Sequence, residues 1–221
     1  VKKGIKPGSD TIYNGAQDNA SGVAQLLAIA QAARALPLAP RRTLYFAAVG
    51  AEEQGLLGSL FLAQNLPVPA GRVALNINMD GGSIHGRTKD LSVIGLGKSE
   101  VDDWIRALAA LQGRAVVPDP SPDKGYFYRS DQFSFAKLGI PAAYCKSGQD
   151  VIGRPAGWGK EKVESFLAKD YHQPSDELRE DWDFSGMVED CQLLFLLGTR
   201  LGNAPGMPKW RPGDEFEAAR H

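Results

Sequence analysis

The sequence predicts an α/β protein in which helices cover both faces of a mixed, mainly parallel β-sheet. Short apolar segments of β-prone residues alternate along the chain with longer segments whose apolar residues recur every three or four positions. Glycine, proline and small polar residues separate these segments. A chain of 221 residues with 43% hydrophobic residues can also bury one substantial core. Strands that alternate with helices are typical of a three-layer α/β/α fold.

The expected elements follow in order from these patterns. Residues 20–36 have a helical apolar repeat that ends before Pro37, and residues 186–201 have the strongest such repeat, with apolar or small residues such as Val188, Cys191 and Leu194 on one face. The expected helices are 20–36, 56–64, 101–111, 132–138 and 186–201. The expected strands are 42–49, 73–79, 91–94, 115–117 and 140–145.

The remaining segments have no clear periodicity. Residues 1–19 are expected to form a loop, residues 118–125 a surface loop, and residues 146–183 an irregular segment with many glycines, prolines and charges. We expect one catalytic domain over residues 1–203, followed by a polar C-terminal tail over residues 204–221.

Composition excludes several classes of function. A formal net charge of −1 gives no basic face for nucleic acid, and no run approaches the roughly 20 apolar residues that span a bilayer. Residues 1–8 are basic but are not followed by the apolar core of a signal peptide. Cys145 and Cys191 are either one disulfide or two buried thiols, and we favour the thiols.

Acidic side chains recur at the ends of the predicted strands. Glu52 and Glu53 follow the strand that ends at Val49, Asp80 follows the strand that ends at Met79, and Asp18 precedes the first helix. Ligands of open α/β sheets bind beyond the carboxyl ends of the strands. Four carboxylates at one edge would repel one another and raise one another's pKa unless cations were bound between them. The pattern therefore predicts a site for divalent metal ions.

A histidine would turn such a site toward zinc. His172 lies in a loop before the last helix, whereas His85 is expected at the surface and His221 in a disordered end. Taken singly, each motif also has a structural interpretation: a helix start for Glu52 and Glu53, a helix cap for Asp18, or a turn at Asp80 or His172. These interpretations explain less well why acids recur at successive strand ends.

Five motifs together resemble the two-zinc aminopeptidases of metallopeptidase family 28, which include bacterial leucine aminopeptidases and glutamate carboxypeptidases. The motifs cover the chain from about residue 10 to the last helix. They are NGAQDNASGVA at 14–24, AEEQGLLGS at 51–59, NINMD at 76–80, RSDQ at 129–132 and YHQPSD at 171–176.

The resemblance implies a role for each metal ligand. Asp18 would bridge two zinc ions and would be followed by a cis peptide bond to Asn19. Glu53 and His172 would complete one zinc position, and Asp80 would belong to the other.

The resemblance also implies the catalytic groups. Glu52 would take a proton from a water that bridges the metals and pass it to the leaving amine. Tyr126 or Tyr128 would steady the oxyanion, and the sequence does not distinguish the two. Ser130 and Asp131 would support the ligands through hydrogen bonds.

Two departures from the family's pattern qualify these expectations. A His-x-Asp segment upstream of Asp18, whose histidine binds the second zinc, is not in this chain, and neither are the first strands of the sheet. We therefore expect the chain to be the C-terminal portion of a longer protein, with the missing N-terminal segment as its partner. Position 132 is Gln where many relatives carry His. Relatives are commonly exported, so the resemblance suggests a secreted or periplasmic location.

Three functions remain open from the sequence. The first is a zinc-dependent aminopeptidase acting on peptides. The second is a single-zinc acyltransferase like the glutaminyl cyclases, for which Asp18, Glu53 and His172 alone would suffice. The third is a non-catalytic binding module with a peptidase-like fold. The presence of Glu52 and of adjacent Asn78 and Asp80 favours the peptidase.

Overall fold

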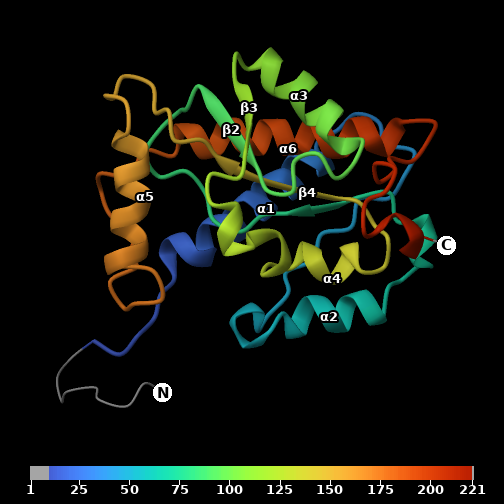
Figure 1. Cartoon of the computed structure of the whole chain (residues 1–221), viewed down its shortest axis with the longest axis horizontal. Helices are drawn as coiled ribbons and strands as arrows, with labels where there is room; N and C mark the ends of the chain where they lie inside the picture. Colours follow the sequence, from blue (N-terminus) through green and yellow to red (C-terminus); the bar gives the residue numbers. More distant parts are fainter. Residues whose placement is uncertain (1–9, 221) are drawn as a thin grey trace.

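A four-stranded sheet lies at the centre of the molecule (Figure 1). The computed structural model describes residues 10–220, so the predictions for residues 1–9 and His221 lie outside it. The strands are β1 (Asn76–Asn78), β2 (Asp90–Val93), β3 (Ala115–Pro118) and β4 (Ala142–Ser147), in the order β1-β4-β2-β3. The pairs β1–β4 and β2–β3 are parallel, and β2–β4 is antiparallel. The prediction of a mixed, mainly parallel sheet is confirmed.

Helices pack on both sides of this sheet. They are α1 (Ser21–Arg34), α2 (Leu57–Gln64), α3 (Val101–Leu111), α4 (Gln132–Ala136), α5 (Trp158–Lys169) and α6 (Ser185–Asn203). In Figure 1, α3 and α6 lie above β4, and α4 and α2 lie below it. Helix α6 contacts α1, α3 and β4, while α4 contacts β1 and β4 and is itself covered by α2.

The main core lies between β2, β4, α3 and α6. Leu91 and Val93 of β2 are buried against Ile105 of α3 and Leu197 of α6. In α6 the buried residues Leu193, Leu194, Leu197 and Leu201 recur at the three-and-four spacing that predicted the helix. Each fully buried side chain of this size stabilises the fold by about 1.5–3 kcal/mol relative to exposure.

The predicted strand at residues 42–49 is wrong. This segment pairs with no strand in the described part of the chain, and Tyr45 is 65% exposed and Phe46 37% exposed. β-propensity mainly reports how well a side chain fits a pleated, paired surface. The apolar, β-prone residues of this segment therefore do not make a strand without a neighbour.

The prediction that residues 146–183 are irregular is also wrong in part, because they contain the twelve-residue helix α5. Its sequence is mostly polar and only Gly159 is buried. A helix with so few buried apolar residues gives a weak periodic signal, which the surrounding glycines and prolines obscure. In Figure 1, α5 stands at one end of the molecule, beside the site described below.

The segment after α6 differs from the expected polar tail. Trp210 is 4% exposed and Phe216 is 6% exposed, and both join a second core cluster with Phe127 and Tyr144. The indole Nε1 of Trp210 donates a hydrogen bond to the carbonyl of Gly139 at 2.9 Å. Trp210 and Phe216 thus anchor the mostly polar segment after α6 to the second core cluster.

Cys145 and Cys191 are free thiols, as favoured from the sequence. Burial raises the pKa of Cys145 to about 12 and that of Cys191 to about 11, so both are inert thiols at neutral pH. Within residues 10–220, no helix combines the length and apolar character needed to cross a membrane.

Candidate metal centre

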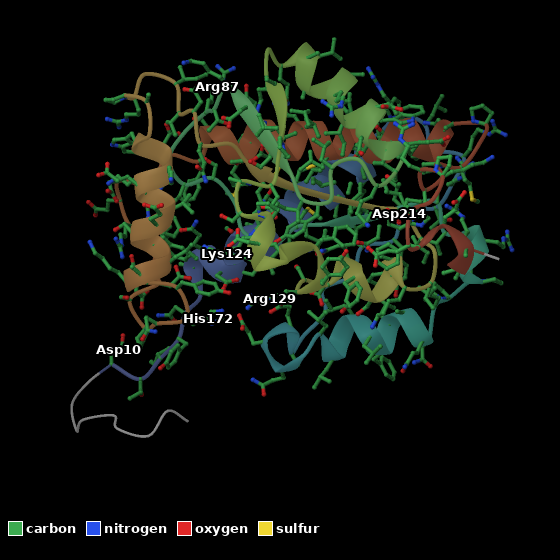
Figure 2. The ribbon with its side chains drawn as sticks, viewed as in Figure 1. Asp10, Arg87, Lys124, Arg129, His172 and Asp214 are labelled. Atoms are coloured by element: carbon green, nitrogen blue, oxygen red, sulfur yellow. The ribbon has the colours of Figure 1, made fainter. Side chains whose placement is uncertain are left out.

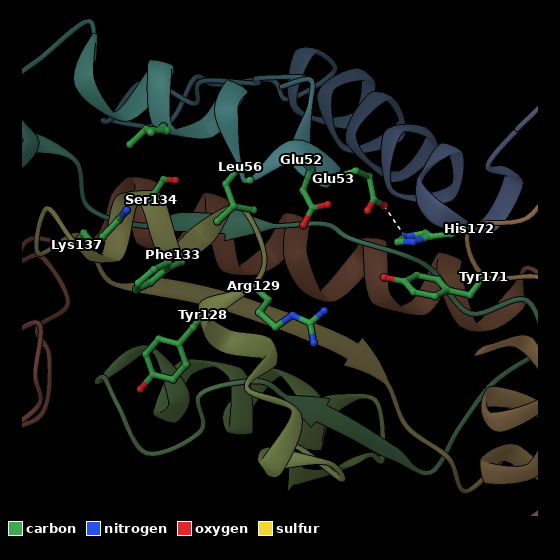
Figure 3. A pocket seen from close by; sticks show the side chains of 12 residues that line it. Glu52, Glu53, Leu56, Tyr128, Arg129, Phe133, Ser134, Lys137, Tyr171 and His172 are labelled. Carbon is green, nitrogen blue, oxygen red and sulfur yellow. Dashed lines mark ion pairs between the residues drawn. The ribbon is translucent and has the colours of Figure 1, made fainter. Parts of the chain in front are cut away.

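Three side chains from distant parts of the chain converge beside α5. The Nε2 atom of His172 lies 2.6 Å from Oε1 of Glu53 and 3.2 Å from Oδ2 of Asp18. Figure 3 shows the Glu53–His172 pair at one end of a cavity. The three ligand atoms all lie within 4.8 Å of one another.

Local structure explains how each residue reaches this point. Asp18 belongs to the turn Ala16–Ala20, just before α1. Glu52 and Glu53 begin the short 3-10 turn Glu52–Gln54. His172 follows the end of α5, so the helix that sequence analysis missed is the element that carries this ligand.

The loop around Asp18 is held from two sides. The carboxylate of Asp176 accepts the backbone N–H of Gln17 at 2.9 Å and that of Asp18 at 3.0 Å. The Asn19 amide donates to the carbonyl of Met79 at 3.1 Å and accepts the N–H of Gly81 at 2.9 Å. The Asp18–Asn19 peptide bond is cis, as the resemblance implied. These contacts tie the Asp18 loop to the end of β1, where Asp80 lies.

Backbone geometry at the site is unusual. Among the described residues, three that are not glycine have positive φ: Ala51 at 57°, Leu56 at 61° and His172 at 57°. Such conformations cost about 1–3 kcal/mol each and tend to cluster at functional sites. All three lie in the segments that carry Glu52, Glu53 and His172. The unfavourable backbone conformations are therefore concentrated around the candidate metal ligands.

The electrostatics of the site are those of crowded carboxylates. Burial raises the pKa of Asp18 to about 6, and the negative charges of Asp80 and Glu53 add to the effect. Burial likewise raises the pKa of Glu52 to about 7, helped by Asp80 and Glu53. These groups resist joint ionisation, and a bound dication would relieve that repulsion.

The donor set fits a zinc ion. Zinc takes imidazole nitrogen and carboxylate oxygen at about 2.0–2.2 Å, which places ligand atoms roughly 3–4 Å apart. The 3.2 Å between His172 and Asp18 lies in this range, and the 2.6 Å between His172 and Glu53 is shorter. Three protein ligands that leave a fourth position open are typical of a catalytic zinc site.

Asp80 lies near this group but is held differently. Its Oδ2 accepts hydrogen bonds from Ser130 at 2.7 Å and from Tyr144 at 2.8 Å. Its Oδ1 takes no hydrogen bond from the described residues. Ser130 therefore contacts Asp80, and its role in supporting a metal ligand stays a prediction. Burial raises the pKa of Asp131, and the nearby charge of Asp80 raises it further.

Gln132 has a structural role at the position where many relatives carry histidine. The side chain is fully buried, accepts a hydrogen bond from Asn78 at 2.8 Å and donates one to the carbonyl of Phe127 at 2.7 Å. It links β1 to the turn that contains Tyr126 and Tyr128.

A cavity of about 450 Å³ opens beside the metal group. One end of the cavity is lined by Glu52, Glu53, Tyr171 and His172. In Figure 3 the carboxylate of Glu52 points into the cavity. Figure 2 places Arg129 and His172 on the same side of the molecule, and both line this cavity. The remaining lining residues are Gly55, Leu56, Leu60, Tyr128, Phe133, Ser134 and Lys137.

The tyrosines are not placed as the sequence suggested. The hydroxyl of Tyr128 donates to Glu215 at 2.6 Å and points away from Glu52 in Figure 3. The ring of Tyr126 lies under the ammonium groups of Lys124 and Lys146. Tyr171 instead stacks on His172 at 3.7 Å, and its hydroxyl points into the cavity in Figure 3.

Sequence reasoning missed three residues at the site: Tyr144, Tyr171 and Asp176. Tyr171 and Asp176 belong to the segment quoted around His172, which was the signal that could have identified them. Burial raises the pKa of Tyr171 to about 12, and the charges of Asp18 and Glu53 raise it further, so its hydroxyl stays protonated and can donate a hydrogen bond.

Carboxylates and one imidazole gather at this edge of an α/β sheet, and such a donor set suits a divalent metal ion. The chain belongs to Peptidase family M28, whose family model matches residues 3–196.

Individual relatives agree with this assignment. The chain is 28% identical over 214 residues to leupeptin-inactivating enzyme 1 of Streptomyces exfoliatus, covering 94% of this chain and 46% of that protein. It is 26% identical to an aminopeptidase from Aneurinibacillus sp. strain AM-1, with a TM-score of 0.58 over 90% of this chain and 42% of the other.

The fold also matches the LapA aminopeptidase of Legionella pneumophila, with a TM-score of 0.62 at 19% identity, over 90% of this chain and 49% of LapA. The chain thus spans about half the length of these relatives.

Proposed function

We propose that this chain carries the catalytic groups of a zinc-dependent aminopeptidase. The observation that supports the proposal most strongly is the convergence of Asp18, Glu53 and His172 within 4.8 Å, beside Glu52 and an open cavity. The family supports a peptidase, and two structural relatives are named as aminopeptidases.

Each residue has a distinct task in this proposal. Asp18, Glu53 and His172 would hold zinc, which would polarise the scissile carbonyl and lower the pKa of the attacking water. Glu52 takes a proton from that water at its carboxylate and returns it to the leaving amine nitrogen. Tyr171 donates its hydroxyl to the carbonyl oxygen as negative charge develops there. Tyr126 and Tyr128 were the earlier candidates for this donor, and the direction of the Tyr171 hydroxyl favours Tyr171.

A second metal position is part of the proposal. Asp18 and Asp80 provide carboxylates for it, and Ser130 fixes the orientation of Asp80. Within residues 10–220, no second histidine joins a group of candidate metal ligands with Asp80. We propose that a further ligand comes from another segment of the protein, as the resemblance implies.

Hydrolysis of defined peptides tests the function. Zinc-loaded protein should release leucine from Leu-Gly-Gly and from leucine p-nitroanilide, and should leave N-acetyl-Leu-Gly-Gly intact. Cleavage of the acetylated peptide at the same rate would contradict an aminopeptidase. Failure to cleave any of the three, with zinc bound, would contradict a hydrolase formed by this chain.

A single-zinc acyltransferase remains a second candidate because residues 10–220 contain one three-ligand group. Mass spectrometry of a peptide with N-terminal glutamine separates the two functions. Loss of ammonia with retention of the residue indicates cyclisation, whereas release of glutamine indicates the aminopeptidase.

A further inference from the structure

Arg129 is one of the two cationic side chains that line the cavity, together with Lys137. It belongs to the segment that connects the turn Tyr126–Tyr128 to α4, and its side chain is exposed. In Figure 3 its guanidinium extends below Glu52 toward Tyr171. Arg129 is therefore in reach of a ligand that occupies the cavity.

The guanidinium of Arg129 has no hydrogen bond or ion pair with any residue between 10 and 220. Four of the other arginines in the described part of the chain are paired with carboxylates: Arg87 with Glu189, Arg114 with Asp190, Arg179 with Asp170 and Arg211 with Asp103. Arg129 lines a cavity together with Glu52 and Glu53 and still pairs with neither. Its five N–H donors are thus available to a ligand.

The other side chains that line the cavity differ in chemistry from Arg129. Leu56, Leu60 and Phe133 form an apolar part that suits a hydrophobic side chain. Lys137, the other cation of the lining, lies 4.8 Å above the ring of Phe133 at the far end. The cavity therefore combines a metal-ligand end, an apolar wall and one free planar cation.

A guanidinium binds a carboxylate through two parallel hydrogen bonds, a geometry that an ammonium group cannot reproduce. We propose that Arg129 binds a carboxylate of the substrate and makes the site selective for peptides that carry one near the scissile bond. The carboxylate is either the C-terminus of a very short peptide or an acidic side chain. This inference rests on the proposed peptidase function and narrows its substrate class.

Paired peptides that differ only in the carboxylate test the proposal. Leu-Gly is compared with Leu-Gly-amide to test the C-terminal carboxylate. Leu-Asp-amide is compared with Leu-Asn-amide to test an acidic side chain at the second residue. Asp-Leu-amide is compared with Asn-Leu-amide to test one at the first residue. The quantity measured is the ratio of kcat/KM within each pair. We expect at least one pair to favour the carboxylate by about 10- to 100-fold, the range of hydrogen bonds to charged groups.

The variants show whether Arg129 causes that preference. Arg129→Ala should reduce the ratio of kcat/KM to about one. Arg129→Lys should keep only part of the preference, because lysine keeps the positive charge but cannot donate two parallel hydrogen bonds. Lys137→Ala, which removes the other cation of the cavity, should keep the preference of the unmutated protein. The pair that responds identifies which carboxylate is bound.

Ligand binding separates this inference from the proposed function. Calorimetry on zinc-loaded Glu52→Gln protein measures the same ratios as dissociation constants, without turnover. Equal affinity within every pair, or the same preference in Arg129→Ala, would overturn the role of Arg129 even if the enzyme is active. Absence of hydrolysis with a carboxylate preference in binding would contradict the peptidase and leave Arg129 supported as a carboxylate-binding residue.

Discussion

Glu52 and Glu53 are neighbours in the chain with different surroundings. Glu53 contacts His172 in the metal group, whereas Glu52 points into the cavity, half-buried and close to Asp80. Adjacent residues in a 3-10 turn diverge by about 120°, which lets Glu53 face His172 while Glu52 faces the cavity.

Replacing Glu52 by Gln should separate chemistry from metal binding. The amide keeps the size of the side chain and cannot accept the proton, so kcat should fall by about 100- to 10,000-fold. The zinc content, measured by mass spectrometry of the metal, should be unchanged. Retention of more than a tenth of the activity would show that another group is the base.

The hydroxyl of Tyr171 points into the cavity, whereas that of Tyr128 points away from Glu52. Tyr171→Phe should lower kcat by about 10- to 1,000-fold through loss of a donor to the oxyanion, with a smaller effect on KM. Tyr128→Phe removes a hydroxyl that is bound to Glu215 and should lower kcat less. Steady-state kinetics on leucine p-nitroanilide compares the two, and a larger loss in Tyr128→Phe would reverse the assignment.

Sequence analysis could predict Asp18, Glu53 and His172 because each lies in a recognisable motif, and the structure places their ligand atoms together. It could not choose the tyrosine, because the direction of a hydroxyl depends on packing far along the chain. Tyr128 is drawn away by Glu215, which lies in a segment that composition described only as polar.

Connections between elements hold the site in shape. Asp176 lies after α5 and fixes the backbone before α1 through the N–H groups of Gln17 and Asp18. Because it is 3% exposed, these hydrogen bonds are shielded from water and orient the loop that presents Asp18.

Removal of this contact should weaken metal binding. Asp176→Ala should raise the zinc dissociation constant by about 10- to 100-fold, the usual effect of losing a group that orients a ligand. Asp181→Ala, an exposed acid of the same segment, is the matched control and should bind zinc as the unmutated protein does. Competition with a fluorescent chelator measures both constants, and equal values would exclude the positioning role.

Helices and strands differ in how well the sequence pattern predicts them. Helix α3 has its predicted bounds, and Val101, Ile105 and Leu108 are buried on one face of it. Helix α5 was missed because its apolar face is nearly absent, and the strand at 42–49 was predicted although it has no partner. Local periodicity identifies elements that bury a face, and pairing depends on the rest of the fold.

Across the whole molecule, the last segment closes the fold over α4 and the turn that carries Tyr128. Trp210 is buried in the second core cluster, and its indole N–H reaches the carbonyl of Gly139. The segment thus links the C-terminal end of the described chain to the cavity wall.

Trp210→Ala should lower the free energy of unfolding by about 3–5 kcal/mol, through lost burial and a cavity in the core. Leu38→Ala removes a side chain that is 83% exposed and should change it by less than about 0.5 kcal/mol. Urea denaturation followed by circular dichroism compares the two. A change of less than 1 kcal/mol in Trp210→Ala would mean that this segment is not part of the cooperative core.

The metal content of a histidine variant shows whether Asp18, Glu53 and His172 bind zinc together. His172→Asn removes the imidazole, and asparagine tolerates the positive φ of this position. His85→Asn removes the half-buried histidine that packs edge-on against Trp158 and serves as the control. After dialysis against limiting zinc, the unmutated protein and His85→Asn should retain at least one zinc ion per chain, and His172→Asn should lose it. Equal zinc in all three proteins would contradict this account of the site.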